Sequence, residues 1–106
     1  MMSIDNIVRR AEWSEKAIER YLVEQVTAHG GECLKYFNMH QVGYPDRIVM
    51  LPSGWTAWVE LKSHDKKPTQ MQRLRHDRLR RLGQTVYVID TRQGVENLIK
   101  DWRAAQ

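Results

Sequence analysis

The strongest structural signal in the sequence is residues 47–62, RIVMLPSGWTAWVELK. The run at 47–51 is mostly apolar, and the run at 55–62 alternates between apolar and other side chains, which is typical of β-strands. Between the two runs lies Pro52-Ser53-Gly54, a sequence that favours a tight turn. The segment therefore predicts a β-hairpin in which Leu51 faces Trp55.

A helix and a short strand are predicted before the hairpin. Residues 14–29 have helical periodicity, with one face formed by Ile18, Tyr21, Leu22, Val23 and Val26. Ser14 is a suitable N-cap, and Trp13 and Ile18 are spaced as a hydrophobic staple around it. Gly30-Gly31 supplies a stop to the helix, and residues 33–37 follow as a candidate strand.

Three more elements are predicted after the hairpin: a helix at 69–82, a buried strand at 85–90 and a final helix at 93–102. The inner face of the first of these helices is expected to carry Met71, Leu74, Leu79 and Leu82. A strand–helix–strand crossover of this length joins parallel neighbours in a sheet. The fold is therefore expected to be α/β, with a mixed central sheet flanked by helices.

The composition is that of a folded protein. The chain has 106 residues, 42% hydrophobic and 28% charged, which predicts a single domain with an N-terminal arm at 1–12 and a core at 13–106. The single cysteine, Cys33, excludes an internal disulfide framework. No apolar run reaches the roughly 20 residues of a membrane span, and the N-terminus is too polar for a signal peptide. We therefore expect a cytoplasmic protein with no membrane partner.

Positive charge is concentrated in one part of the chain. The formal net charge is +4, from 17 Lys and Arg against 13 Asp and Glu. Positions 62–81 hold many of these basic residues, namely Lys62, Lys66, Lys67, Arg73, Arg75, Arg78, Arg80 and Arg81. Such a patch is typical of a protein that binds a polyphosphate. A solvated basic helix face has the same pattern and is the alternative.

Two carboxylates and a lysine are predicted to meet at one end of the hairpin. Strand alternation places Glu60 and Lys62 on the same face, and counting outward from the turn puts Asp46 opposite or diagonal to Glu60. Each placement has an ordinary explanation as well. Glu60 and Lys62 fit a same-face ion pair, and Asp46 fits a turn aspartate that accepts from loop N–H groups.

A third carboxylate has an unusual position on the first helix. Glu15 projects between Leu22 and Val26 on a helical wheel, inside the apolar face. A buried charge needs a partner or a metal ion, because leaving it unpaired is costly. The alternative is an exposed acid in the first turn, where it interacts favourably with the helix dipole.

Taken together, these residues suit metal-assisted hydrolysis. Carboxylate oxygens are the ligands that Mg²⁺ prefers, and a bound ion polarises a phosphate and lowers the pKa of its water. A neighbouring lysine would orient that water or offset developing charge. The four histidines of the chain have no spacing typical of a metal site.

The same residues resemble the signature of a nuclease family. Gly43-Tyr44-Pro45-Asp46 and Glu60-Leu61-Lys62 are similar to the GxPD…ExK motif of the PD-(D/E)XK nuclease superfamily, and most similar to its VRR-NUC (virus-type replication–repair nuclease) branch. Further similarity lies at Ser14 to Glu19, Gly30-Gly31, Lys66-Lys67-Pro68, Gln72 and Leu82-Gly83. The resemblance covers roughly residues 14–90. It implies a restriction-endonuclease-like αβββαβ core.

The resemblance also implies roles for individual residues. Asp46 and Glu60 are expected to bind Mg²⁺, for which Mn²⁺ would substitute, and the backbone carbonyl of Leu61 is expected to be a further ligand. Lys62 is expected to be the catalytic lysine. Glu15 is expected to act in catalysis, directly or through a metal-bound water, with Glu19 as the alternative. DNA contacts are expected from Lys66, Lys67, Gln72, Arg73 and Arg80.

Short members of this family come mostly from phages and prophages and resemble homodimeric, structure-selective endonucleases. The resemblance therefore implies a homodimer that cleaves four-way (Holliday) junctions in DNA repair, in the cytoplasm of a bacterial host. Two alternatives stay open at this point. One is a non-catalytic DNA-binding module with a vestigial site, and the other is a flap, nick or restriction-like nuclease with the same site.

Overall fold

A computed structural model describes residues 14–106 of the chain. In chain order its elements are α2 (Glu15–Ala28), β1 (Glu32–Lys35), β2 (Arg47–Leu51), β3 (Trp55–Leu61), α3 (Gln70–Arg81), β4 (Val86–Ile89) and α4 (Arg92–Ala104). The predicted N-terminal arm and the Trp13 side of the predicted staple lie outside the described residues.

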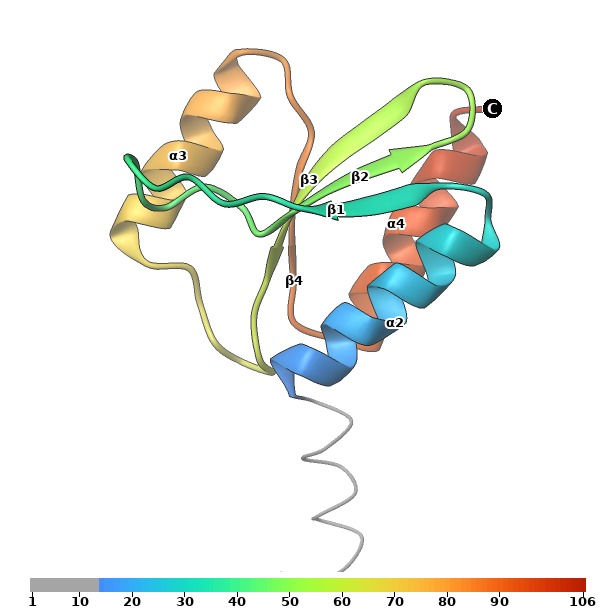
Figure 1. The fold of residues 1–106 in the computed structure, drawn as a ribbon, viewed down its shortest axis with the longest axis horizontal. Coiled ribbons are helices and arrows are strands. Elements are labelled where there is room, and N and C mark those ends of the chain that lie inside the picture. Colours follow the sequence, from blue (N-terminus) through green and yellow to red (C-terminus); the bar gives the residue numbers. More distant parts are fainter. Residues whose placement is uncertain (1–13) are drawn as a thin grey trace, which may run out of the picture.

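The four strands form one mixed sheet in the order β1-β2-β3-β4. The first three strands are antiparallel neighbours, and β3 pairs with β4 in parallel. Helices α2 and α4 lie against each other on one side of this sheet, whereas α3 lies on the other side (Figure 1). The predicted α/β architecture with a mixed, helix-flanked sheet is confirmed.

The hydrophobic core lies between the sheet and the α2–α4 pair. It is made of buried side chains from α2, the three strands β2, β3 and β4, and α4: Ile18, Leu22, Val26, Val49, Leu51, Val59, Leu61, Ile89, Val95, Leu98 and Ile99. The helical periodicity of the sequence predicted the α2 contribution, except that Tyr21 and Val23 are only half-buried. Within the described residues, no helix is both long and apolar enough to cross a membrane.

The hairpin has the predicted register, with Leu51 paired to Trp55. Ser53 and Gly54 both adopt positive φ in the turn between them. Element ends differ by a few residues from those predicted. Strand β1 begins at Glu32 and ends at Lys35, so Phe37 lies in the loop, and α4 continues to Ala104.

The inner face predicted for α3 is confirmed at Leu79 and wrong at the other three positions. Met71, Leu74 and Leu82 are exposed, and the buried side chains of this helix are His76 and Leu79. The reason is that α3 lies over the sheet face that carries Glu60, so a polar histidine rather than a row of apolar residues faces the strands.

Gly31 stands at the tight junction between α2 and β1. A Cβ atom there would lie 2.3 Å from the Met50 carbonyl oxygen and 3.0 Å from Val26 Cγ1. We expect Gly31→Ala to lower the free energy of unfolding by about 3 kcal/mol, because the backbone must shift to admit the methyl group. Gly83→Ala is the control: its Cβ meets nothing within 4 Å, and its φ of +87° predicts a loss of only about 1 kcal/mol. Urea denaturation followed by circular dichroism measures both, and equal losses would contradict the steric explanation.

Candidate metal and active site

The β2–β3 register brings Asp46 and Glu60 together. Arg47 pairs with Val59, so the next positions outward along the two strands are Asp46 and Glu60. Asp46 precedes β2 directly, after the buried Pro45, and its Oδ2 accepts a hydrogen bond of 2.9 Å from the backbone N–H of Leu61. This bond fixes one carboxylate oxygen beside the end of β3. Asp46 is also close enough to Glu60 to affect the ionisation of that carboxyl.

Glu60 is a buried carboxylate with polar neighbours on several sides. Its side chain accepts from Gln72 Nε2 at 3.3 Å and lies 3.4 Å from His76 Nε2. The ammonium group of Lys62 is 3.9 Å from Glu60 Oε2, at the outer limit of an ion pair. With a relative exposure of 1%, Glu60 has almost no contact with solvent.

Burial controls the ionisation of Glu60. It raises the pKa of this carboxyl to about 8, with a further upward contribution from Asp46, and with Lys62 acting in the opposite direction. Without a metal ion, the Glu60 carboxyl therefore holds a proton near neutral pH. A hard divalent cation takes oxygen ligands and would compensate both charges in place of that proton. The donor set of Asp46 and Glu60 fits such an ion.

Glu15 is not buried, which corrects the placement inside the apolar face. Its side chain is exposed at the start of α2, where Ser14 caps the helix by accepting from Ala17 N–H at 3.1 Å. The position is nevertheless close to the carboxylate pair. Partial burial raises the pKa of Glu15, the charge of Asp46 raises it further, and Lys62 lowers it. Glu15 therefore lies near Asp46, at the start of α2 rather than on the sheet.

Glu19 lies one turn further along α2 and has a partner of its own. Its Oε2 accepts from Arg47 Nε at 3.0 Å, and Arg47 also donates to the Cys33 carbonyl at 3.0 Å. The guanidinium of Arg47 pairs with Glu19, whereas among residues 14–106 no ion pair is formed by Glu15, whose charge lies near Asp46. This contrast favours Glu15 over Glu19 as the helix carboxylate of the site.

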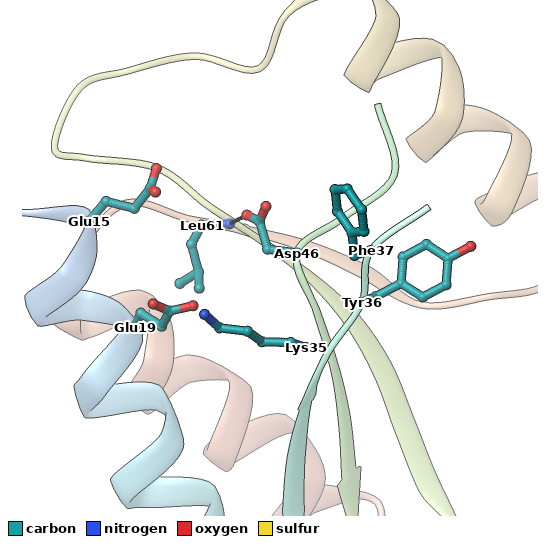
Figure 2. A pocket seen from close by; sticks show the side chains of 7 residues that line it. All are labelled: Glu15, Glu19, Lys35, Tyr36, Phe37, Asp46 and Leu61. Carbon is teal, nitrogen blue, oxygen red and sulfur yellow. Dashed lines mark hydrogen bonds between the residues drawn. The ribbon is translucent and has the colours of Figure 1, made fainter. Parts of the chain in front are cut away.

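Asp46 and the two α2 carboxylates border one cavity of about 290 Å³, whose lining is Glu15, Glu19, Lys35, Tyr36, Phe37, Asp46 and Leu61 (Figure 2). Glu60 and Lys62 do not belong to this lining. Lys35, Tyr36 and Phe37 were not predicted as site residues. The pairing of Lys35 with Arg47 brings them there, and the sequence did not indicate which strand β1 would pair with. His76 was also missed, although its spacing of four residues from Gln72 puts both on one face of α3.

The predicted DNA-binding residues are spread over the β3–α3 loop and α3. Lys66 and Lys67 are exposed in that loop, and Arg73 and Arg80 are exposed on the helix. Arg80 also donates to the Val86 carbonyl at 2.9 Å, which attaches α3 to the start of β4. Gln72 differs from this group, because its amide donates to Glu60 while its carbonyl accepts from the Thr69 N–H.

A histidine does take part in a possible second metal-binding group. Ligand atoms of His64, Asp65 and Asp90 all lie within 4.8 Å of one another. The spacing of the histidines along the sequence gave no indication of this, because the parallel pairing of β3 with β4 brings Asp90 next to the residues after β3.

Comparisons with known proteins agree with this geometry. No family model matches the chain. A protein of Acyrthosiphon pisum secondary endosymbiont phage 1, named "Putative nuclease p44", is 42% identical over 77 residues, which are 73% of this chain and 83% of the relative. A solved structure described as "VRR_NUC domain" superposes with a TM-score of 0.78 at 33% identity, covering 81% of this chain and 94% of the other.

Proposed function

This chain belongs to the VRR-NUC family of nucleases, and we propose that it is a divalent-metal-dependent endonuclease that hydrolyses phosphodiester bonds in DNA. The observation that carries the proposal is the buried Glu60 carboxyl beside Asp46, with Lys62 at 3.9 Å. Two neighbouring carboxylates with so little compensating positive charge are unfavourable in a purely structural role.

Asp46 and Glu60 would hold Mg²⁺, or Mn²⁺ in its place, together with the backbone carbonyl of Leu61. When bound, the ion polarises a phosphate oxygen and lowers the pKa of water at the site. The Leu61 N–H keeps the Asp46 carboxylate in place for this role, at 2.9 Å. Lys62 then orients the attacking water or offsets the charge that develops on the phosphate, and the reaction passes through no covalent intermediate.

Glu15 faces this pair from α2 and would act on the water or on the hydration of the metal. Gln72 would position Glu60 rather than read DNA, because both ends of its amide are already hydrogen-bonded within the protein. Exposed Lys66, Lys67, Arg73 and Arg80 would contact the phosphate backbone. The phage origin of one relative supports a phage or prophage origin and action in the cytoplasm of a bacterial host.

We further propose a homodimer that prefers four-way junctions, in the setting of DNA repair or recombination. Each chain supplies one Asp46–Glu60 site, and cutting a two-fold symmetric junction on both strands requires two sites at a fixed separation. A C2 dimer supplies that geometry.

Light scattering at micromolar protein, paired with cleavage assays, tests this substrate and assembly. We expect a dimer that cleaves a four-way junction faster than a flap or a linear duplex of the same arm sequence. All substrates are compared at one salt concentration, because affinity through phosphate contacts depends steeply on salt. A monomer that cuts all three equally would contradict the junction proposal and leave the nuclease proposal intact.

A further inference from the structure

A loop beside the cavity exposes apolar side chains to solvent. Phe37, Met39 and Val42 have relative exposures of 83%, 81% and 69%. We name residues 37–42 the apolar loop. Phenylalanine is usually buried, and a group of exposed apolar residues is typical of a contact surface.

Hydrogen bonds hold the apolar loop in shape. Asn38 Oδ1 accepts from the N–H groups of His40 and Gln41, each at 2.9 Å. Asn38 Nδ2 donates to the Tyr36 hydroxyl at 3.2 Å. At the far end, Arg75 Nε donates to the Val42 carbonyl at 3.0 Å. The loop backbone around Phe37 is therefore held in place before any partner arrives, which lowers the entropy cost of a contact there.

The residue before Phe37 anchors the loop from below. Tyr36 packs edge-on against Trp58 at 5.1 Å and against Tyr44 at 5.8 Å, and the Arg75 guanidinium lies over the Tyr44 ring at 5.0 Å. The Phe37 ring takes no part in these contacts. Figure 2 shows Tyr36 and Phe37 turned to different sides of the backbone, with Phe37 standing next to Asp46.

The location of Phe37 ties it to the site. Its side chain lines the same cavity as Asp46 and Glu15, so an aromatic face borders the place where the scissile phosphate would bind. The loop that follows packs on α3, since a Cβ on Gly43 would lie 2.8 Å from Met71 Cγ. The apolar loop therefore lies next to both the cavity of Asp46 and helix α3, which carries the exposed Arg73 and Arg80.

We propose that Phe37 stacks on the open face of a nucleobase at a branch point, next to the scissile phosphate, and thereby favours branched DNA over linear duplex. This inference rests on the proposed nuclease function. In a continuous duplex both faces of each base are covered by its neighbours, whereas a branch point offers an open face to a rigid aromatic ring. Such stacking is sequence-tolerant, because every base has a π-face.

A second copy of the chain is a less suitable occupant of the apolar loop. A protein surface covering Phe37 would also cover the cavity that Phe37 lines, and would block access to Asp46. A nucleic acid, in contrast, must enter that cavity with one phosphate and brings its bases alongside.

The test uses the full chain without divalent metal, so that binding is measured with no cleavage. The probe is a four-way junction with 2-aminopurine at the branch, and the comparison is a linear duplex of equal length. We expect wild type to quench the fluorescence of the branch base, Phe37→Ala to abolish the quenching, and its junction affinity to fall about tenfold. Phe37→Tyr should restore both, and Phe37→Leu, which is apolar but not aromatic, should not.

Leu82→Ala is the matched control, since Leu82 is equally an exposed apolar side chain but lines none of the described cavities. It should behave as wild type. Unchanged quenching in Phe37→Ala, or wild-type quenching and junction affinity in Phe37→Leu, would overturn the proposal, as would a shift of Phe37→Ala to monomer in light scattering. Cleavage of the same junction by wild type in Mg²⁺ is scored separately, so a failure of the nuclease proposal is distinguishable from a failure of the stacking proposal.

Discussion

The Asp46→Asn variant is expected to cleave DNA more than about 100-fold more slowly than wild type. Residues that only support a metal ligand typically cost about 10- to 100-fold when they are replaced, and the loss of a ligand itself should exceed that. Asparagine keeps the size of the side chain and an oxygen that can accept from the Leu61 N–H, but it removes the negative charge. The loss therefore reports on metal binding rather than on folding. Cleavage of a labelled junction in Mg²⁺ and in Mn²⁺ measures it. Binding of the same DNA without metal should survive.

Asp101→Asn makes the identical chemical change far from the cavity. Asp101 lies on α4 and accepts from the Tyr87 hydroxyl at 2.7 Å, and it lines none of the described cavities. This variant should cleave as wild type does. Glu60→Ala and Lys62→Ala should fail as Asp46→Asn does. Retained cleavage in Asp46→Asn would contradict the assignment of the site.

The second large effect is a dependence of metal affinity on pH. Burial raises the pKa of Glu60 from 4.5 to about 8, so the carboxyl is mainly protonated at pH 6 to 7 in the absence of metal. A metal ion must displace that proton. We expect the apparent affinity for Mn²⁺ to fall about 50-fold between pH 8 and pH 6, approaching tenfold per pH unit at the lower end of this range.

Calorimetric titration in two buffers of different ionisation enthalpy measures both the affinity and the protons released. About one proton should leave per metal at pH 7, because the group is then mostly protonated. The same shift predicts that the metal-free protein becomes less stable as pH rises from about 4.5 to about 8, since its folded state binds the extra proton in that window. A flat affinity between pH 6 and pH 8 would contradict the role of Glu60 as a buried ligand.

Much of the fold was predictable because local signals agreed with one another. The Pro52-Ser53-Gly54 turn determined the pairing of β2 with β3, and that register alone placed Asp46 beside Glu60. The crossover through α3 required β4 to run parallel to β3. Alternation along β3 separated the core face from the face of Glu60. Each of these inferences follows from a local signal in the sequence: a turn, the length of a crossover, or the alternation along one strand.

The rest depended on contacts between distant segments. Helical periodicity alone does not reveal what lies opposite a helix, so the burial of His76 against Glu60 and the exposure of Leu74 were not predicted. Glu15 is the first residue of α2, and solvent reaches its side chain there, although the same helix face is buried one turn further along. Phe37 was predicted to lie in a strand, because aromatic residues are common in strands. Strand β1 ends earlier, at Lys35, and this leaves Phe37 exposed beside the cavity.

Gln72 connects the start of a helix to the proposed chemistry. Its carbonyl closes the capping box with the Thr69 N–H at 2.9 Å, and its amide donates to Glu60 at 3.3 Å. A glutamate would retain the first bond and lose the second, and an asparagine is too short to span both. Protein engineers who transplant this site into another scaffold therefore cannot choose the helix N-terminus and the metal ligand as separate modules. The two must be transferred as one unit.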